Sequence, residues 1–310
     1  MKPPLVLLAL LLAAAAPRAV TAPRCPGADP AAMALLAAMA DAPLRRSFEA
    51  AVTLRRGDTV RSMRLRHRVG PEAVSEALTF EKGREVQVLR ASHPLRCEHP
   101  GQQLLRAAAA PEGGCGLGDH YRLALTEGGR VAGRRTVGLV LQPRDLFRHG
   151  YVFEVDRETS LPLKGTIVAA GGRALEQFRF ARLQAGVEGS LEASRGRVHR
   201  AGHPHPSSPA RGDPGAPPWR VGWTPAGFVA TDAATSGARR TFTDGLAAFS
   251  VFIERLPGPL PAGEGVAREG STVSYTRALR LGSLPVLVTV LGEVPVNTAR
   301  MVADAVRPER

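Results

Sequence analysis

Two acidic residues, Glu154 and Asp156, have the spacing of a carboxylate pair on a strand. They flank Val155 in an alternating run, and alternate residues of a strand lie on the same face. Such a pair can share acid and base roles, but the alternative is a solvated strand end, and no partner acid or substrate cleft is visible in the sequence. We therefore favour the solvated strand end.

Other catalytic signatures are also missing from the sequence. It contains no G-x-S-x-G elbow, no H-E-x-x-H motif, no phosphate loop and no dinucleotide fingerprint. Asp244-Gly245 is typical of a turn before a strand. We predict a protein that is not an enzyme, with no catalytic residue, no cofactor and no metal site.

The first 22 residues have the pattern of an export signal. Lys2 is followed by an apolar run from Leu5 to Ala16 and by the small-residue sequence Val20-Thr21-Ala22. We expect cleavage after Ala22 and a location outside the cytoplasm. Lipidation at Cys25 is the weaker alternative, because Pro23-Arg24 is not the small-residue pair that precedes a lipidated cysteine.

The formal charge is +13, and 38 of the 41 basic residues are arginine. A basic surface attracts polyanions, and the arginine fork matches phosphate and carboxylate groups. The sequence has no zinc-finger spacing and no RNA-binding box, so we exclude nucleic acid as a partner. Outside the cytoplasm, a phosphorylated glycolipid or an acidic protein segment fits this charge better. The arginine bias alone is also typical of a GC-rich genome.

Three cysteines remain after the signal. In an oxidising compartment Cys97 and Cys115 could form a disulfide, which leaves Cys25 free or paired between chains. Three histidines nearby suggest zinc as an alternative, but the paired spacing of zinc ligands is missing, so we favour the disulfide. These histidines are His93, His99 and His120.

The first half of the mature chain predicts a β-rich domain over residues 23–194. Asp29 and Pro30 indicate a helix start, and Met33, Leu36 and Met39 form its apolar stripe. Alternating apolar runs follow, and we expect a large half-open antiparallel β-barrel with a covering helix and an apolar concavity. The runs are 48–54, 63–69, 78–89, 121–125, 137–141, 151–155 and 178–180.

A Pro- and Gly-rich linker over residues 195–218 predicts a second, small α+β domain over residues 219–310. We expect strands at 248–253, 272–275 and 286–290. A terminal helix should follow, with Asn297 as N-cap and an apolar stripe of Met301, Val302, Ala305 and Val306.

Several longer blocks occur in a distinctive order. They are RVAGR (130–134), QPRD (142–145) with FRHGY (147–151), TSLPLK (159–164), LEQFRF (175–180), PAGF (225–228), TDGLAAFSVFIE (243–254) and GEVP (292–295) with TA (298–299). This order resembles the MucB/RseB family of periplasmic sigma-E regulators, over about residues 44–306.

The resemblance implies a domain similar to the lipoprotein carriers LolA and LolB, a small second domain and a periplasmic location. It also implies a negative regulator that binds the periplasmic domain of a single-span RseA/MucA-type anti-sigma factor and shields it from proteolysis. Lipopolysaccharide or lipoprotein acyl chains would lift the shield, and a homo-oligomer is plausible. The alternative function is a periplasmic lipid or lipoprotein carrier.

Two groups of residues are candidates for partner or lipid binding. Arg144, Arg148 and Tyr151 combine cations with an aromatic ring beside a turn, although Arg144-Asp145 is equally consistent with an internal salt bridge. Aromatic residues of the second domain form the other group, and core packing is the alternative for at least half of them. They are Trp223, Phe228, Phe249 and Phe252.

Overall fold

The computed structural model describes residues 29–70, 73–80, 90–94, 115–187, 218–230, 239–258 and 263–309. The predicted signal peptide and nearly all of the predicted linker lie outside these residues, so both stay predictions, as do the domain boundaries. We call the part up to residue 187 the large half and the part from residue 218 the small half. Within the described residues, no helix has the length and apolar character that a membrane span requires.

The opening helix α1 (Pro30–Arg45) confirms the predicted helix start. The Asp29 side chain accepts a hydrogen bond from the Ala31 amide at 2.8 Å, as an N-cap does. The helix buries Ala32, Leu36, Met39 and Ala42, so the apolar stripe differs from the predicted one at Met33, which is only half-buried.

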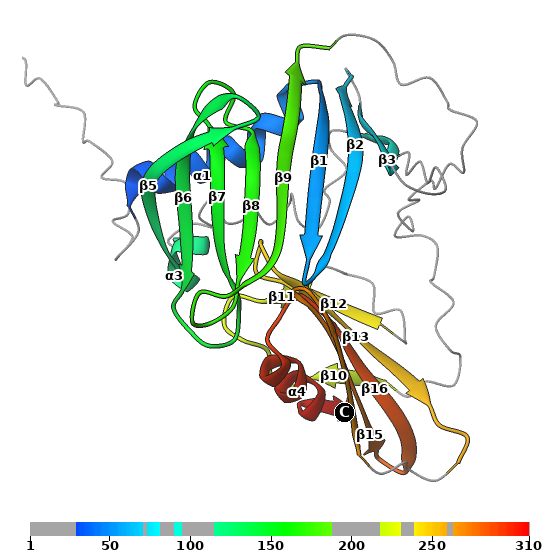
Figure 1. The fold of residues 1–310 in the computed structure, drawn as a ribbon. Helices are drawn as coiled ribbons and strands as arrows, with labels where there is room; N and C mark the ends of the chain where they lie inside the picture. Colours follow the sequence, from blue (N-terminus) through cyan, green and yellow to red (C-terminus); the bar gives the residue numbers. More distant parts are fainter. Residues whose placement is uncertain are drawn as a thin grey trace, which may run out of the picture.

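The large half contains a nine-stranded antiparallel sheet in the order β4-β3-β2-β1-β9-β8-β7-β6-β5. This sheet is open at both ends, and Figure 1 shows α1 crossing behind strands β5 to β8. The half-open β-rich fold is therefore confirmed. The strands are β1 (Phe48–Arg56), β2 (Thr59–Val69), β3 (Ala73–Phe80), β4 (Arg90–Pro94), β5 (Tyr121–Val131), β6 (Arg134–Pro143), β7 (Gly150–Asp156), β8 (Pro162–Val168) and β9 (Ala174–Ala185).

Two apolar clusters lie on the α1 side of this sheet. One joins α1 to β5, β6 and β7 through Leu36, Leu123 and Leu139, and the other joins the end of α1 to β1, β2, β8 and β9. Strand β8 was not expected, because Pro162, Lys164 and Gly165 interrupt its apolar alternation.

A short helix, α3 (Leu117–His120), precedes β5. Cys115, just before it, is disulfide-bonded. Cys97 and Cys25 lie outside the described residues, so the pairing of Cys97 with Cys115 stays a prediction.

The small half contains a six-stranded antiparallel sheet in the order β11-β12-β13-β16-β15-β14 and a two-stranded sheet of β10 and β17. Helix α4 (Val296–Asp304) contacts β15 and β16. This confirms the predicted α+β character. The strands are β10 (Trp219–Val221), β11 (Val229–Ala230), β12 (Arg239–Thr243), β13 (Ala248–Arg255), β14 (Glu264–Glu269), β15 (Thr272–Leu281), β16 (Leu284–Gly292) and β17 (Val306–Pro308).

The prediction for the terminal helix was wrong in its phase. The N-cap is Pro295 and not Asn297, and no side chain caps this end. Val294 is fully buried in the core of the small half, Pro295 follows it as the N-cap, and α4 begins at Val296. The buried stripe is therefore Thr298, Ala299, Val302 and Ala303, while Met301 is 41% exposed and Val306 belongs to β17.

Candidate functional site

The loop between β6 and β7 carries Arg148, whose side chain is fully buried. Its Nη1 donates to Asp244 Oδ2 at 2.7 Å, and its Nη2 donates to the Ala226 carbonyl at 2.5 Å. Its Nε donates to both carboxylate oxygens of Asp145 at 3.1 Å. Asp145 and Arg148 belong to the large half, whereas Ala226 and Asp244 belong to the small half. The guanidinium therefore joins the two halves.

Asp244 completes this network from the turn between β12 and β13. Its Oδ1 accepts from the amides of Leu246 and Ala247 at 3.0 and 2.9 Å, so the turn holds the carboxylate in place. Its Oδ2 accepts from Arg148 and from the Tyr121 hydroxyl, which lies 2.9 Å away. We call Tyr121, Arg148, Ala226 and Asp244 the junction.

Charge pairing keeps the Arg148 guanidinium ionised despite its burial. Burial acts to lower the pKa of Arg148, but the hydrogen bond to Asp145 and the attraction of Asp244 and Tyr121 raise it overall. Burial, and then the charge of Asp244, raise the pKa of Tyr121, which therefore stays a hydrogen-bond donor. A buried ion pair adds little net stability, but removing one partner leaves the other charge uncompensated.

Aromatic rings and one glycine pack around the junction. The Arg148 guanidinium carbon lies 5.6 Å from the ring centre of Tyr121 and 5.2 Å from that of Phe228. Gly227 has φ of +84°, and a Cβ there would lie 2.1 Å from His120 Nε2. Only glycine fits at this contact between the halves.

Further hydrogen bonds also join the halves. Ser271 Oγ donates to Glu176 Oε2 at 3.0 Å, and Glu176 also accepts two hydrogen bonds of 3.1 Å from Arg56. In α4, Thr298 Oγ1 donates to the Phe147 carbonyl at 3.0 Å. Figure 1 shows the small half at one end of the large sheet, where these contacts lie.

A cavity of about 760 Å³ opens beside the junction, and we call it the interhalf cavity. It is lined by residues 140–143, 145–146, 148–151 and 168–173 of the large half and by Arg268, Val273 and residues 294–297 of the small half. Most of these side chains are apolar, and Arg173 and Arg268 add positive charge. The cavity thus combines an apolar lining with cations from both halves.

Two buried polar groups line the interhalf cavity. His149 Nδ1 and the Tyr151 hydroxyl have no hydrogen-bond partner among the described residues. Burial, followed by the charges of Arg268 and Arg173, lowers the pKa of His149 to about 4. The imidazole is therefore neutral at pH 7, and a ligand in the cavity could satisfy both polar groups.

The predicted binding residues of the large half have different surroundings. Arg148 lies in the junction and Tyr151 lines the interhalf cavity. Arg144 is exposed, and its Nε donates to the carbonyls of Gly118 and Tyr121 at 3.1 and 3.4 Å. Asp145, the alternative partner of Arg144, binds Arg148. Binding roles for these residues stay predictions.

The predicted aromatic group of the small half is not one surface. Phe228 and Phe249 are buried against each other, with ring centres 5.1 Å apart. Trp223 is half-buried and packs edge-on against Phe147 at 5.3 Å. Phe252 is half-buried and points to the opposite face of β13 from Phe249. The structure therefore does not bring these four side chains together.

The carboxylates Glu154 and Asp156 lie in separate ion pairs. Glu154 binds Lys164 Nζ at 2.9 Å, and Asp156, with 1% of its side chain exposed, binds Arg134 and Thr159. The prediction of a solvated strand end is wrong for Asp156. Burial acts to raise the pKa of Asp156, but the hydrogen bonds from Arg134 and Thr159 lower it overall.

Metal binding has no candidate site in the described part of the chain, where no three His, Cys, Asp or Glu side chains are grouped to hold an ion. The side chains of His93 and His99, named in the zinc alternative, are outside the described set. His120 packs against Gly227, and burial, followed by the charge of Arg148, lowers its pKa.

The comparisons with known proteins cover both halves. The model of the MucB/RseB N-terminal domain matches residues 31–200, and that of the MucB/RseB C-terminal domain matches residues 213–307. The sigma factor AlgU regulatory protein MucB of Pseudomonas aeruginosa is 33% identical over 289 residues, which are 87% of this chain and 89% of that protein.

Solved structures of MucB are also similar. The complex of Pseudomonas aeruginosa MucA and MucB contains a chain with a TM-score of 0.72 and 29% identity, covering 90% of this chain and 99% of that one. A crystal structure of MucB in complex with MucA(peri) gives a TM-score of 0.71 and 31% identity at the same coverage. This chain therefore belongs to the MucB/RseB family.

Proposed function

We propose that this protein is a periplasmic negative regulator of a sigma-E-type stress response. It binds the periplasmic domain of a single-span anti-sigma factor, shields that domain from proteolysis, and releases it when it senses lipopolysaccharide or lipoprotein. The observation that carries this proposal is the likeness of both halves to MucB, at 33% identity over 87% of the chain.

The arrangement of the halves supports partner binding. Both halves superpose together on MucB chains from complexes with MucA, with coverage of 99% of those chains. The junction fixes this arrangement through Arg148 and Asp244, both buried. A partner that contacts both halves would find its two contact surfaces already oriented, which reduces the entropy cost of binding.

The interhalf cavity supports release by a lipid. A ligand there would touch the loop that carries Arg148 and the segment that leads into α4. Its apolar lining suits acyl chains, and Arg173 and Arg268 suit an anionic head group. A ligand shifts the equilibrium only by its different affinity for the two states, so it must compete with the partner or favour a changed arrangement of the halves.

A lipid or lipoprotein carrier is the second candidate function, and the same cavity favours it. A carrier would transfer acylated cargo between membranes without any effect on an anti-sigma factor. Self-association, the remaining prediction about partners, would be measured by sedimentation of the same protein samples.

The test combines residues 23–310 with the periplasmic fragment of the anti-sigma factor and the protease that cleaves it first. We expect the protein to slow cleavage of the fragment, and we expect lipid A to restore the faster rate. As a control, an unrelated substrate of the same protease should be cleaved at an unchanged rate. If the fragment is cut equally fast with and without the protein, the regulatory function is wrong, whereas transfer of acylated cargo in a parallel assay would favour the carrier.

A further inference from the structure

One face of the large sheet carries a cluster of arginines that belong to neither the junction nor the interhalf cavity. Phe48, Val52 and Met63 of β1 and β2 point toward α1 and its core, so the alternate residues point outward. Of the outward positions on β2, β1 and β9, six are arginines, and we call the five that make no ion pair with a described residue the arginine face. They are Arg55, Arg64, Arg66, Arg179 and Arg182.

The strand register places these arginines in one patch. Arg64 pairs with Ala51, which in turn pairs with Arg182 on the far side of β1. Ser62, Thr53 and Arg179 form the next row. From strand spacing, the patch is about 10 Å wide and about 20 Å long. The central residues Ala51 and Thr53 have small side chains, so the patch is flat and its cations lie around this centre.

This patch contains almost no compensating negative charge. Glu49 is the carboxylate on the outer face of β1, β2 and β9, and Arg68 holds it at 2.5 Å. The five arginines make no ion pair with any described residue, although arginines elsewhere, such as Arg56 and Arg134, do. Like charges on neighbouring strands repel each other, so an anionic partner would relieve this repulsion.

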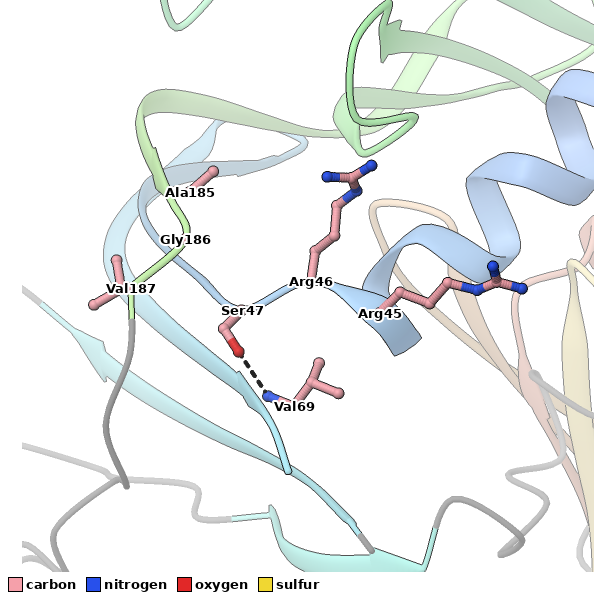
Figure 2. Close-up of a pocket in the computed structure, with 7 residues that line it drawn as sticks. All are labelled: Arg45, Arg46, Ser47, Val69, Ala185, Gly186 and Val187. Carbon is pink, nitrogen blue, oxygen red and sulfur yellow. Dashed lines mark hydrogen bonds between the residues drawn. The ribbon is translucent and has the colours of Figure 1, made fainter. Parts of the chain in front are cut away.

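A second opening lies at the end of the same strands. A cavity of about 410 Å³ is lined by Arg45, Arg46, Ser47 and Val69 on one side and by residues 185–187 on the other. Figure 2 shows the two arginines extending from the end of α1, while Ser47 Oγ accepts from the Val69 amide at 2.9 Å. Arg46 adds a cation at the end of these strands but is not part of the arginine face.

We propose that the arginine face docks on the surface of an anionic phospholipid bilayer. A bilayer presents phosphates in a plane, which matches a flat array of guanidinium groups, and arginine binds phosphate oxygens through two parallel hydrogen bonds. Among the outward residues of β1, β2 and β9, no aromatic ring lies between the arginines, so these strands offer no platform for stacking with nucleic acid bases. Docking would keep this regulator at the membrane from which a single-span partner emerges, but it needs no such partner.

The test measures binding of the full mature chain to vesicles by flotation. Vesicles of phosphatidylglycerol and phosphatidylcholine in equal parts should bind, and vesicles of phosphatidylcholine alone should not. Each arginine near an anionic surface is worth about fivefold in partitioning. The double variant Arg64→Glu and Arg182→Glu should therefore lose at least about 25-fold. Salt should weaken binding of the wild type, because the Debye length falls to about 8 Å at physiological ionic strength.

A matched variant separates this site from general charge. Arg239→Glu with Arg255→Glu makes the same change of net charge at exposed arginines of the small sheet and should change binding far less. The neutral pair Arg64→Gln and Arg182→Gln, checked by thermal unfolding, provides a second measurement if charge reversal impairs folding. Three results would each overturn the proposal. The first is an equal loss of vesicle binding in both charge-reversal variants, and the second is equal binding of the wild type to neutral vesicles. The third is that inorganic phosphate displaces the protein from vesicles more than chloride does at the same ionic strength.

Discussion

Arginine occupies two opposite environments in this protein. In the junction, the side chain of Arg148 is fully buried and donates to Asp145, Ala226 and Asp244. On the arginine face, Arg64 and Arg182 are exposed and have no ion pair with any described residue. The same side chain therefore fixes the position of one half against the other in one region and leaves a cationic surface in the other.

Burial explains why these regions should respond differently to mutation. A buried carboxylate such as Asp244 needs its cation, because no water replaces it. An exposed arginine needs no partner, because water hydrates it. It lowers the stability of the fold only through repulsion from neighbouring cations. We therefore expect folding to depend on the junction and association with anions to depend on the arginine face.

The largest effect is expected for Arg148→Met. It removes the cation and leaves Asp244 with only Tyr121 and two backbone amides as donors. The free energy of unfolding should fall by about 3–5 kcal/mol. Urea denaturation followed by tryptophan fluorescence would measure this, because Trp223 packs on Phe147 beside the junction.

Arg64→Met is the control for this change, since it removes the same group from an exposed site. It should change stability by less than about 0.5 kcal/mol. Equal losses in the two variants would mean that burial does not distinguish the two regions.

The next effect is a pH dependence that comes from His149. Its pKa is about 4 in the folded protein, against the 6.5 of an ordinary histidine in the unfolded chain, so the unfolded chain binds a proton more tightly. Stability is then complete above pH 6.5 and falls as the pH drops toward 4, by at most about 3 kcal/mol. Urea denaturation across this range would measure the slope.

The variant His149→Gln should flatten that slope, because it removes the titrating group. The pKa of Glu293 is raised by burial and by the charge of Glu176, so Glu293 contributes with the opposite sign. Glu293 is present in both the wild type and the variant, so its contribution cancels when their pH profiles are subtracted. Parallel pH profiles for the two proteins would contradict the role of His149.

Much of the fold could be predicted from the sequence. The hairpin of β1 and β2 was predictable because Phe48, Val52 and Met63 alternate and Gly57 permits a left-handed turn. Strand β8 was not predictable, because its apolar residues alternate poorly and it is held in the sheet by pairing with β7 and β9. The phase of α4 also depended on a tertiary contact, the burial of Val294.

The site was much less predictable. Arg148 and Tyr151 were found from their types and spacing, but their burial depends on a half that is distant in sequence. Asp244 was interpreted only as part of a turn, which it is, and nothing local indicates that its second oxygen faces Arg148. The arginine face was hidden for a different reason: its members lie on three strands, and only the register of β9 against β1 brings them together.

A smaller effect is expected for Tyr121→Phe, which removes one donor to Asp244 and keeps the ring. A hydrogen bond to a charged group is worth about 2 kcal/mol, and stability should fall by about that amount. Tyr151→Phe is the matched control, because its hydroxyl has no partner among the described residues. The control should be neutral or stabilising, and a loss there as large as at Tyr121 would mean that the Tyr151 hydroxyl is already satisfied.

The smallest effect is expected on the arginine face itself, where Arg64→Thr should raise stability by a few tenths of a kcal/mol. The gain comes from reduced repulsion, so it should disappear as salt screens the charges. Arg68→Thr, on the same face of β2, should instead destabilise, because Arg68 binds Glu49 and donates to the Phe48 carbonyl at 3.2 Å. Thermal unfolding at low and high salt separates the two cases. If both substitutions destabilise the protein equally, the arginine face contributes to folding, and the expected difference between this face and the junction is wrong.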